Sequence, residues 1–284
     1  ALMSISIPEG VSKIPDYAFS ECNNLKNITL PFSLKEIGGN AFAQTGIDSI
    51  IIPENTETIK YRAFSNCNEL KEITLPDSVR ELGIYAFSGC TKLNFASLSD
   101  SITEIKESTF SGCTGLAEVK LPNGVLKLSK NAFSNCSTLK EITLPDTITT
   151  TEEAVFSGCK NLTSVNYPKN WTTASSNGKI FYGCEALTSI SVPEGVTRIP
   201  NYAFYGCSNL KSISLPETLT AIGTAAFQSC AKLEEINIPS SVEEVGLRAF
   251  LGCISLTKIS LSDKITEIKE GTFSGCTGLA EVKL

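Results

Sequence analysis

The sequence predicts a repeat solenoid, mostly β with turns and short 3-10 or helical segments, in which parallel strands stack one per repeat. The first observation is a 23-residue pattern that recurs through the 284 residues, because a fixed period of this size is typical of solenoids and propellers. The second is an alternation of apolar and polar residues at the same place in each repeat. The third is an unbroken series of phenylalanines at one position of the pattern.

The repeat is written L-x-x-I-x-L-P-x-x-V-x-x-I-x-x-x-A-F-x-x-C-x-x, and residues 70–92 follow it closely. Twelve copies and a truncated thirteenth open at Leu2, Leu25, Ile47, Leu70, Leu93, Leu116, Leu139, Leu162, Leu187, Leu210, Leu233, Leu256 and Leu279. We expect a single solenoid domain over 1–284. We also expect the chain to be a fragment of a longer protein, because solenoids need capping repeats and the pattern is cut at both ends.

The first part of each repeat reads as a half-buried strand. Ile73 and Leu75 alternate with Glu72 and Thr74, and a proline follows. Equivalent segments lie one coil apart, so they should pair in register as a parallel sheet with a strand spacing of ~4.8 Å. The outward positions of this sheet, of the Glu72 and Thr74 type, then remain open to a partner.

The second part of each repeat returns the chain toward the core. Val79 and Leu82 open a short apolar segment that suits a turn or a short strand on the opposite wall. The phenylalanine that follows should stack from coil to coil, so that Phe87 lies between Phe64 and Phe110. One repeat alone cannot offset the entropy of ordering about 23 residues, whereas stacked neighbours can.

Eleven cysteines occur, with one in nearly every repeat, and the chain has no histidine. Metal sites usually combine closely spaced cysteines with histidine, which this pattern lacks. Parallel side chains that point into one core also present poor vectors for disulfides. We therefore expect a series of buried, reduced thiols that act as small hydrophobic residues.

The composition argues against several classes of function. Without histidine the commonest general base is missing, and paired carboxylates such as Glu152-Glu153 fall at solvent-facing positions. The net charge of −6 offers no basic field for nucleic acid, and no apolar run reaches the ~20 residues of a membrane span. We expect no enzyme activity, no cofactor, no metal, no nucleic-acid partner and no membrane insertion by these residues.

The pattern LxxIxLPxxVxxIxxxAFxxC resembles the BspA-like leucine-rich repeats of bacterial surface proteins over the whole chain. The resemblance implies a right-handed leucine-rich-repeat superhelix in which the LxxIxL strands form a parallel concave sheet. It also implies cell-surface or secreted localisation and a role in adhesion. It brings no ligand-contact motif that could be transferred residue by residue.

Positions where a repeat departs from the pattern are the best candidates for functional residues. The eighth repeat has two extra residues and the only tryptophan, Trp171. Either Trp171 fills a widened coil, or it joins Tyr167 and Tyr182 in a partly exposed aromatic site, since binding surfaces favour tyrosine and tryptophan. The second repeat is one residue short and has Thr45-Gly46 in place of the cysteine, which we interpret as a tightened turn.

The fifth repeat places Phe95 at an outward position and Ala96 at a core position. Phe95 is then a candidate contact residue, unless a register slip turns it inward. The predicted partner-binding residues come from the fourth to eighth repeats. They are Glu72, Thr74, Phe95, Ser97, Glu118, Lys120, Glu141, Thr143, Asn166, Tyr167, Trp171 and Tyr182.

These observations favour a non-catalytic surface or secreted module that binds extracellular protein or glycan partners, on host or neighbouring cells, through the concave face. One alternative is a passive stalk or spacer for a missing domain. The other is a cytoplasmic protein-interaction scaffold, which reduced cysteines would favour.

Overall fold

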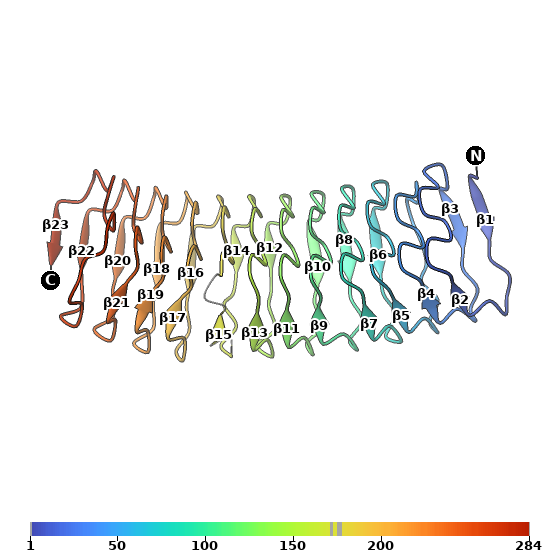
Figure 1. The fold of residues 1–284 in the computed structure, drawn as a ribbon, viewed down its shortest axis with the longest axis horizontal. Coiled ribbons are helices and arrows are strands. Elements are labelled where there is room, and N and C mark those ends of the chain that lie inside the picture. The colour runs from blue at the N-terminus through green and yellow to red at the C-terminus, as the bar shows by residue number, and fades with distance from the viewer. Residues whose placement is uncertain (1, 171–172, 175–177, 284) are drawn as a thin grey trace. The chain divides into compact units, whose positions relative to one another are not determined.

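The computed structural model describes residues 2–170, 173–174 and 178–283 (Figure 1). It is a parallel-strand β-solenoid, as the sequence predicts, and the described residues form two compact units, Ala1–Leu139 and Lys140–Leu284. The single domain over 1–284 stays a prediction. Among the described residues no helix is long and apolar enough to cross a membrane.

Each coil except the third contributes a strand to a first wall, built from the LxxIxL segment, because alternating apolar residues bury one face of it. In the first unit these strands are β1 (Ser4–Ser6), β3 (Asn27–Thr29), β6 (Glu72–Thr74), β8 (Phe95–Ser97) and β10 (Glu118–Lys120). In the second unit they are β12 (Glu141–Ile142), β14 (Ser164–Val165), β16 (Ser189–Ser191), β18 (Ser212–Ser214), β20 (Glu235–Asn237), β22 (Lys258–Ser260) and β23 (Glu281–Lys283).

A second wall of two-residue strands forms where the sequence predicts a turn or a short strand. In the first unit it contains β2 (Lys13–Ile14), β4 (Glu36–Ile37), β5 (Thr58–Ile59), β7 (Glu81–Leu82), β9 (Glu104–Ile105) and β11 (Lys127–Leu128). In the second unit it contains β13 (Thr150–Thr151), β15 (Thr173–Ala174), β17 (Arg198–Ile199), β19 (Ala221–Ile222) and β21 (Glu244–Val245).

The strands of the first wall pair in parallel and in the register of one repeat. Across β6, β8 and β10, Phe95 lies opposite both Glu72 and Glu118. In the same ladder Ala96 pairs with Ile73, and both are buried. In each strand the residues directly before and after this buried central residue point outward. Together these side chains form what we call the outward sheet face.

The core of each coil is a column of phenylalanines. Phe87 is fully buried and stacks on Phe64 at 5.3 Å and on Phe110 at 5.6 Å between ring centroids. The same stacking continues in the second unit, for example between Phe204 and Phe227 at 5.5 Å. Full burial of such a side chain stabilises the fold by roughly 2 to 3 kcal/mol, so the column holds neighbouring coils together.

The segment around Ala-Phe is a series of tight turns, and within the described residues none of the short 3-10 or helical segments that the sequence predicts is formed. Two residues per coil, four positions apart, have a positive φ, as in Asn40 (54°) and Gln44 (58°). This left-handed conformation breaks a right-handed helix at each occurrence. We call this part of the coil the turn wall.

Backbone hydrogen bonds of the turn wall run from one coil to the next. The N–H of Tyr17 donates to the carbonyl of Gly39 at 2.8 Å, and the N–H of Asn40 donates to the carbonyl of Tyr61 at 2.9 Å. Because residues 39 and 40 share one peptide group, each peptide accepts from the earlier coil and donates to the later one. The N–H of Phe42 makes the equivalent bond to the carbonyl of Ala63 at 2.8 Å.

The cysteines lie in the core as free thiols, and nine of the eleven are buried. The thiol of Cys90 donates to the carbonyl of Phe64 at 3.1 Å, and that of Cys207 donates to the carbonyl of Phe181 at 3.1 Å. The prediction of buried thiols is confirmed for nine positions, while Cys22 and Cys276 are partly exposed. The hydrogen bond to the preceding coil shows that the residue does more than fill space.

The third coil of the first unit differs from its neighbours on the first wall. In the described part of that unit, residues 49–52 form no strand, and β3 and β6 belong to separate sheets. The preceding repeat is one residue short, and Thr45 takes the cysteine position, where its hydroxyl donates to the carbonyl of Phe42 at 2.9 Å. The second wall stays continuous there, through β4, β5 and β7.

Candidate binding surface

Six of the predicted contact residues lie together on the sheet of β6, β8 and β10. The two outward rows of this sheet are Glu72, Phe95 and Glu118, and Thr74, Ser97 and Lys120. Glu72, Thr74, Glu118 and Lys120 are exposed, whereas Phe95 and Ser97 are half-buried. The repeat spacing of 23 residues therefore brings these side chains side by side, as predicted.

Phe95 faces outward, which settles the choice that the sequence left open. Ala96 takes the buried position beneath the sheet, so the register does not slip. The ammonium of Lys120 lies 5.2 Å from the centre of the Phe95 ring and 4.0 Å from the carboxylate of Glu118. A cation over an aromatic face is stabilised by the quadrupole of the ring, and the pair offers a partner both an apolar and a cationic contact.

Glu141, Thr143 and Asn166 belong to the outward face of the second unit, and all three are exposed. Asn166 already has a structural role. Its side-chain oxygen accepts from the N–H of Leu144 at 2.7 Å, and its amide nitrogen donates to the carbonyl of Leu144 at 2.7 Å. The side chain continues the pairing of β12 and β14 beyond their two-residue ladder, so these polar atoms are occupied.

The predicted aromatic site of the eighth repeat is not formed as an exposed cluster that includes Tyr167. Tyr167 occupies the Leu75-type core position and is buried, and this burial raises the pKa of its phenol. Tyr182 is partly exposed and stacks on Tyr205, with 4.7 Å between the ring centroids. Trp171 lies outside the described residues.

A broad hollow lies on the outward face of the second unit, over β14, β16 and β18. Its volume is about 720 Å³. The outward side chains that line it are small and polar, namely Ser164, Asn166, Ser189, Ser191, Ser212 and Ser214. Serine is the smallest hydroxyl side chain, so the sheet surface lies deeper here, and the hollow offers hydroxyl donors and acceptors.

Two further hollows lie beside the third coil of the first unit, and sequence reasoning missed their central residues. Their volumes are about 520 Å³ and 280 Å³, and Ile51 lines both. Ile51 is 87% exposed, and Phe32, which lines the larger hollow, is 62% exposed. Comparison among repeats could have found them, because serine, threonine, asparagine or lysine stands at every other Ile51-type position.

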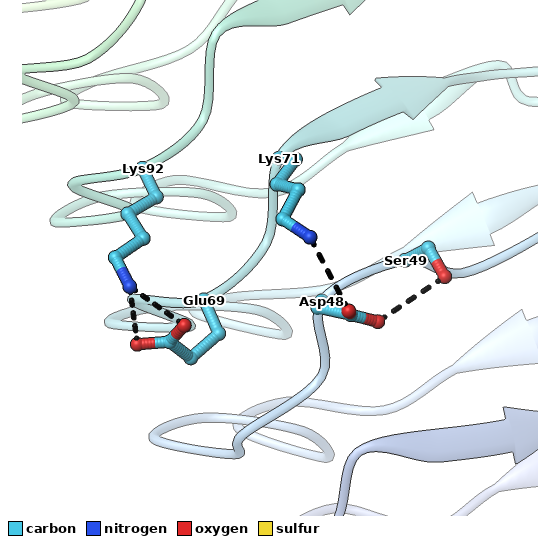
Figure 2. Close-up of polar contacts among 5 residues, drawn as sticks. All are labelled: Asp48, Ser49, Glu69, Lys71 and Lys92. Carbon is cyan, nitrogen blue, oxygen red and sulfur yellow. Dashed lines mark hydrogen bonds and ion pairs between the residues drawn. The ribbon is translucent and has the colours of Figure 1, made fainter.

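Ion pairs link successive coils beside this region (Figure 2). The ammonium of Lys71 lies 3.4 Å from the carboxylate of Asp48, which also accepts from the hydroxyl of Ser49 at 3.4 Å. Lys92 contacts both carboxylate oxygens of Glu69, at 2.9 Å and 2.7 Å. These pairs are exposed, and each stabilises the fold by at most about 1 kcal/mol.

Within the described residues no group of three or more cysteine, aspartate or glutamate side chains could hold a metal ion. The buried thiols are also poor nucleophiles, because burial raises the pKa of Cys90 and Cys207 and the thiolate is the reactive form. The outward sheet face presents hydroxyls, carboxylates and a few apolar side chains.

Comparison with known proteins agrees with the coils described above. The family whose description is BspA type leucine rich repeat region matches in six copies over residues 1–113, 82–178 and 177–284. A leucine-rich repeat protein of known structure from Bacteroides ovatus is 33% identical, with a TM-score of 0.81 over 99% of this chain and 78% of its own. No curated protein sequence matches the chain.

Two other solved structures share the fold. A leucine-rich cell surface protein from Faecalibacterium prausnitzii is 29% identical, with a TM-score of 0.65 over 99% of this chain and 87% of its own. The pneumococcal vaccine antigen PcpA is 22% identical, with a TM-score of 0.62 over 99% of this chain and 77% of its own. Proteins with such repeats are generally non-enzymatic scaffolds that bind other proteins. On its repeat pattern, its stacked coils and the match along its whole length, the chain belongs to the BspA-type leucine-rich-repeat family.

Proposed function

We propose that this chain is a non-catalytic adhesion module of a surface or secreted protein and that it binds protein partners through its outward sheet face. The observation that carries the proposal is the row of side chains over β6, β8 and β10, where charged, apolar and hydroxyl groups lie adjacent and open to solvent. Such a mixture suits a broad contact surface, in which a few anchor residues carry most of the binding energy. Glycan partners would use the hydroxyl-lined hollow over β14, β16 and β18.

The surface localisation is supported by similarity. The Faecalibacterium prausnitzii protein is described as a cell surface protein, and it covers nearly the whole of this chain. The family match extends over the same residues. Contact with a partner that is displayed in many copies would also compensate for modest affinity at each site.

One observation favours a second candidate function, a protein-interaction scaffold inside the cell. All eleven cysteines stand as free thiols, and reduced thiols are typical of reducing compartments. Detection of the chain on intact cells with a surface-specific antibody would support the exported module. Its restriction to the cytoplasm of the producing cell would support the scaffold instead.

Substitution of Phe95, Glu118 and Lys120 by alanine tests the binding face. We expect the triple variant to bind extracellular-matrix proteins and whole host or neighbouring cells at least about tenfold more weakly, because hot-spot residues typically contribute more than 1 to 2 kcal/mol each. The matched control replaces Glu104 and Lys127 of the second wall, which form an ion pair at 3.1 Å. Equal binding by the wild type and the triple variant would contradict the proposed face and favour the passive stalk.

A further inference from the structure

The exposed apolar pair Phe32 and Ile51 is the strongest departure from the repeat on the surface of the first unit. Phe32 stands at the eighth position of its repeat, after the proline, and this position is acidic in eight other repeats, from Glu9 to Asp263. Ile51 stands at the outward repeat position that Thr29 and Thr74 hold in the flanking coils. Both side chains line the 520 Å³ hollow, so they form one apolar surface rather than two isolated exposures.

Carboxylates surround this apolar surface. Glu9 and Glu54 hold the post-proline position in the coils before and after Phe32, so an acidic residue flanks the ring on either side. Glu9 lines the larger hollow, while Glu54 and Glu72 line the smaller one, together with Ile51. The patch therefore combines two exposed apolar side chains with three exposed acidic ones.

The charges of these three carboxylates are not neutralised by lysine or arginine, in contrast to those beside them. Asp48 and Glu69 each pair with a lysine of the next coil (Figure 2). Among the ion pairs of the described residues, none includes Glu9, Glu54 or Glu72. The oxygens of Glu9 do accept from the backbone N–H groups of Phe32 and Ser33, at 2.9 Å and 3.4 Å. That contact fixes the carboxylate beside the ring and leaves its charge uncompensated.

We propose that this patch is a docking site for an extended basic segment of a protein partner, which carries lysine or arginine beside apolar side chains. An apolar side chain of the segment fills the hollow between Phe32 and Ile51, and its cations approach Glu9, Glu54 and Glu72. Charge complementarity argues for this occupant, because an acidic segment would be repelled and a neutral one would leave the carboxylates unpaired. Residues 49–52 lack the strand pairing of the neighbouring coils, so the patch also coincides with an interruption of the first wall. The inference rests on the proposed protein-binding function and specifies the partner's chemistry.

The experiment measures fluorescence anisotropy of a short labelled peptide of alternating lysine and leucine as the chain is added. Matched peptides have glutamate in place of lysine or serine in place of leucine. We expect the Lys–Leu peptide alone to bind, and added salt to weaken its binding because exposed charges are screened. The double variant Ile51→Thr with Phe32→Asn should raise the Kd about tenfold, the ratio that corresponds to 1.4 kcal/mol. Both new residues occur at these positions in other repeats, so the variant should keep its fold.

A charge variant separates this site from general attraction between a basic peptide and an acidic protein. Glu54→Gln with Glu72→Gln should raise the Kd about threefold or more, and Glu235→Gln, an outward carboxylate of the second unit on β20, should leave it unchanged. The inference would be overturned if Glu235→Gln raised the Kd as much as the double variant does. It would also be overturned if the Glu–Leu peptide bound as tightly as the Lys–Leu peptide. If cells or matrix proteins still bind through Phe95 in that case, the proposed function stands and only the basic docking site is lost.

Discussion

A single buried aromatic position decides how strongly neighbouring coils adhere. Phe87 contacts a ring on both sides, at 5.3 Å and 5.6 Å, and has no solvent exposure. Truncation of this side chain leaves a cavity that the two flanking rings cannot fill, because each is held by its own coil.

Phe87→Ala should therefore lower the free energy of unfolding by about 3 to 5 kcal/mol, through lost burial and the cavity. Urea denaturation followed by circular dichroism measures the loss. Phe95→Ala is the matched control, because that ring is half-buried on the outward face, and its truncation should cost less than about 1 kcal/mol. Similar losses for the two variants would mean that the column does not hold the coils together.

Residue roles were predictable where the repeat is obeyed and less so where it is broken. The burial of Phe87 and the outward direction of Glu72 follow from position in the pattern. Tyr167 was predicted as a partly exposed contact residue, but it stands at a core position and the structure buries it. Ile51 was missed because an isoleucine in a strand pattern suggests core, and only comparison with the other repeats marks its position as outward.

At the scale of the structural elements, the turns contain residues with a strained backbone. Gln44 lies in the left-handed region with φ of 58°, at a position where other repeats have glycine, such as Gly89 and Gly112. A residue with a Cβ pays a conformational cost there that glycine does not.

Gln44→Gly should raise the free energy of unfolding by about 0.5 to 1 kcal/mol, because the exposed side chain of Gln44 contributes little packing and the backbone strain is relieved. Thermal unfolding by calorimetry tests this. Gln44→Ala keeps the Cβ and should give no such gain. A destabilised glycine variant would show that the side chain has a stabilising contact.

The side chain of Asn166 extends the pairing of β12 and β14 through its bonds to the Leu144 backbone, and the contribution of these bonds to stability can be tested. Asn166→Ala removes both hydrogen bonds to Leu144 and should lower the free energy of unfolding by about 1 to 3 kcal/mol. Asn237 holds the same position on β20, where the ladder has its full three residues, so Asn237→Ala should change stability by less than about 0.5 kcal/mol. Denaturant titration of the two variants distinguishes them, and equal losses would contradict the structural role of Asn166.

The strands followed from the sequence, but the turns and the interruption did not. Alternation of Ile73 and Leu75 with polar neighbours leaves one face to bury, and this predicts the first wall. The left-handed residues of the turn wall were not predictable, because nothing in the sequence marks Tyr85 or Ala225 as left-handed. The missing strand at residues 49–52 depends on how a one-residue deletion is absorbed among three coils, which no local pattern encodes.

On the scale of the whole molecule, the series of buried thiols makes the fold less stable at alkaline pH. Burial raises the pKa of Cys90, Cys184, Cys207 and Cys230. In the unfolded chain a cysteine ionises near pH 8.5, whereas in the folded chain these thiols stay protonated at higher pH. The stability is therefore fully present below about pH 8.5 and falls as the pH rises above it, by up to about 1.4 kcal/mol per pH unit for each thiol.

Urea denaturation in the presence of a reductant, from pH 7 upward, should show this decline. Cys207→Ala should reduce the slope above pH 8.5 by about 1.4 kcal/mol per pH unit, because one titrating group is removed. Val196→Ala is a suitable control, since it removes buried apolar atoms and should lower stability by a similar amount at every pH. An unchanged slope in Cys207→Ala would show that its ionisation is not linked to unfolding.

The hydrogen bonds of the turn wall give each unit a net dipole along the direction in which its coils stack. The peptide group that joins residues 39 and 40 accepts from Tyr17 and donates to Tyr61, and the peptide of residues 61 and 62 continues the series to Ile84. Aligned peptide groups polarise one another and add their dipoles, as they do along an α-helix. In this series the N–H groups that bond between coils point toward the later coils, so the two sides of a coil are not equivalent for a charge. An anion beside the turn wall is favoured on the side of the later coils and a cation on the side of the earlier ones.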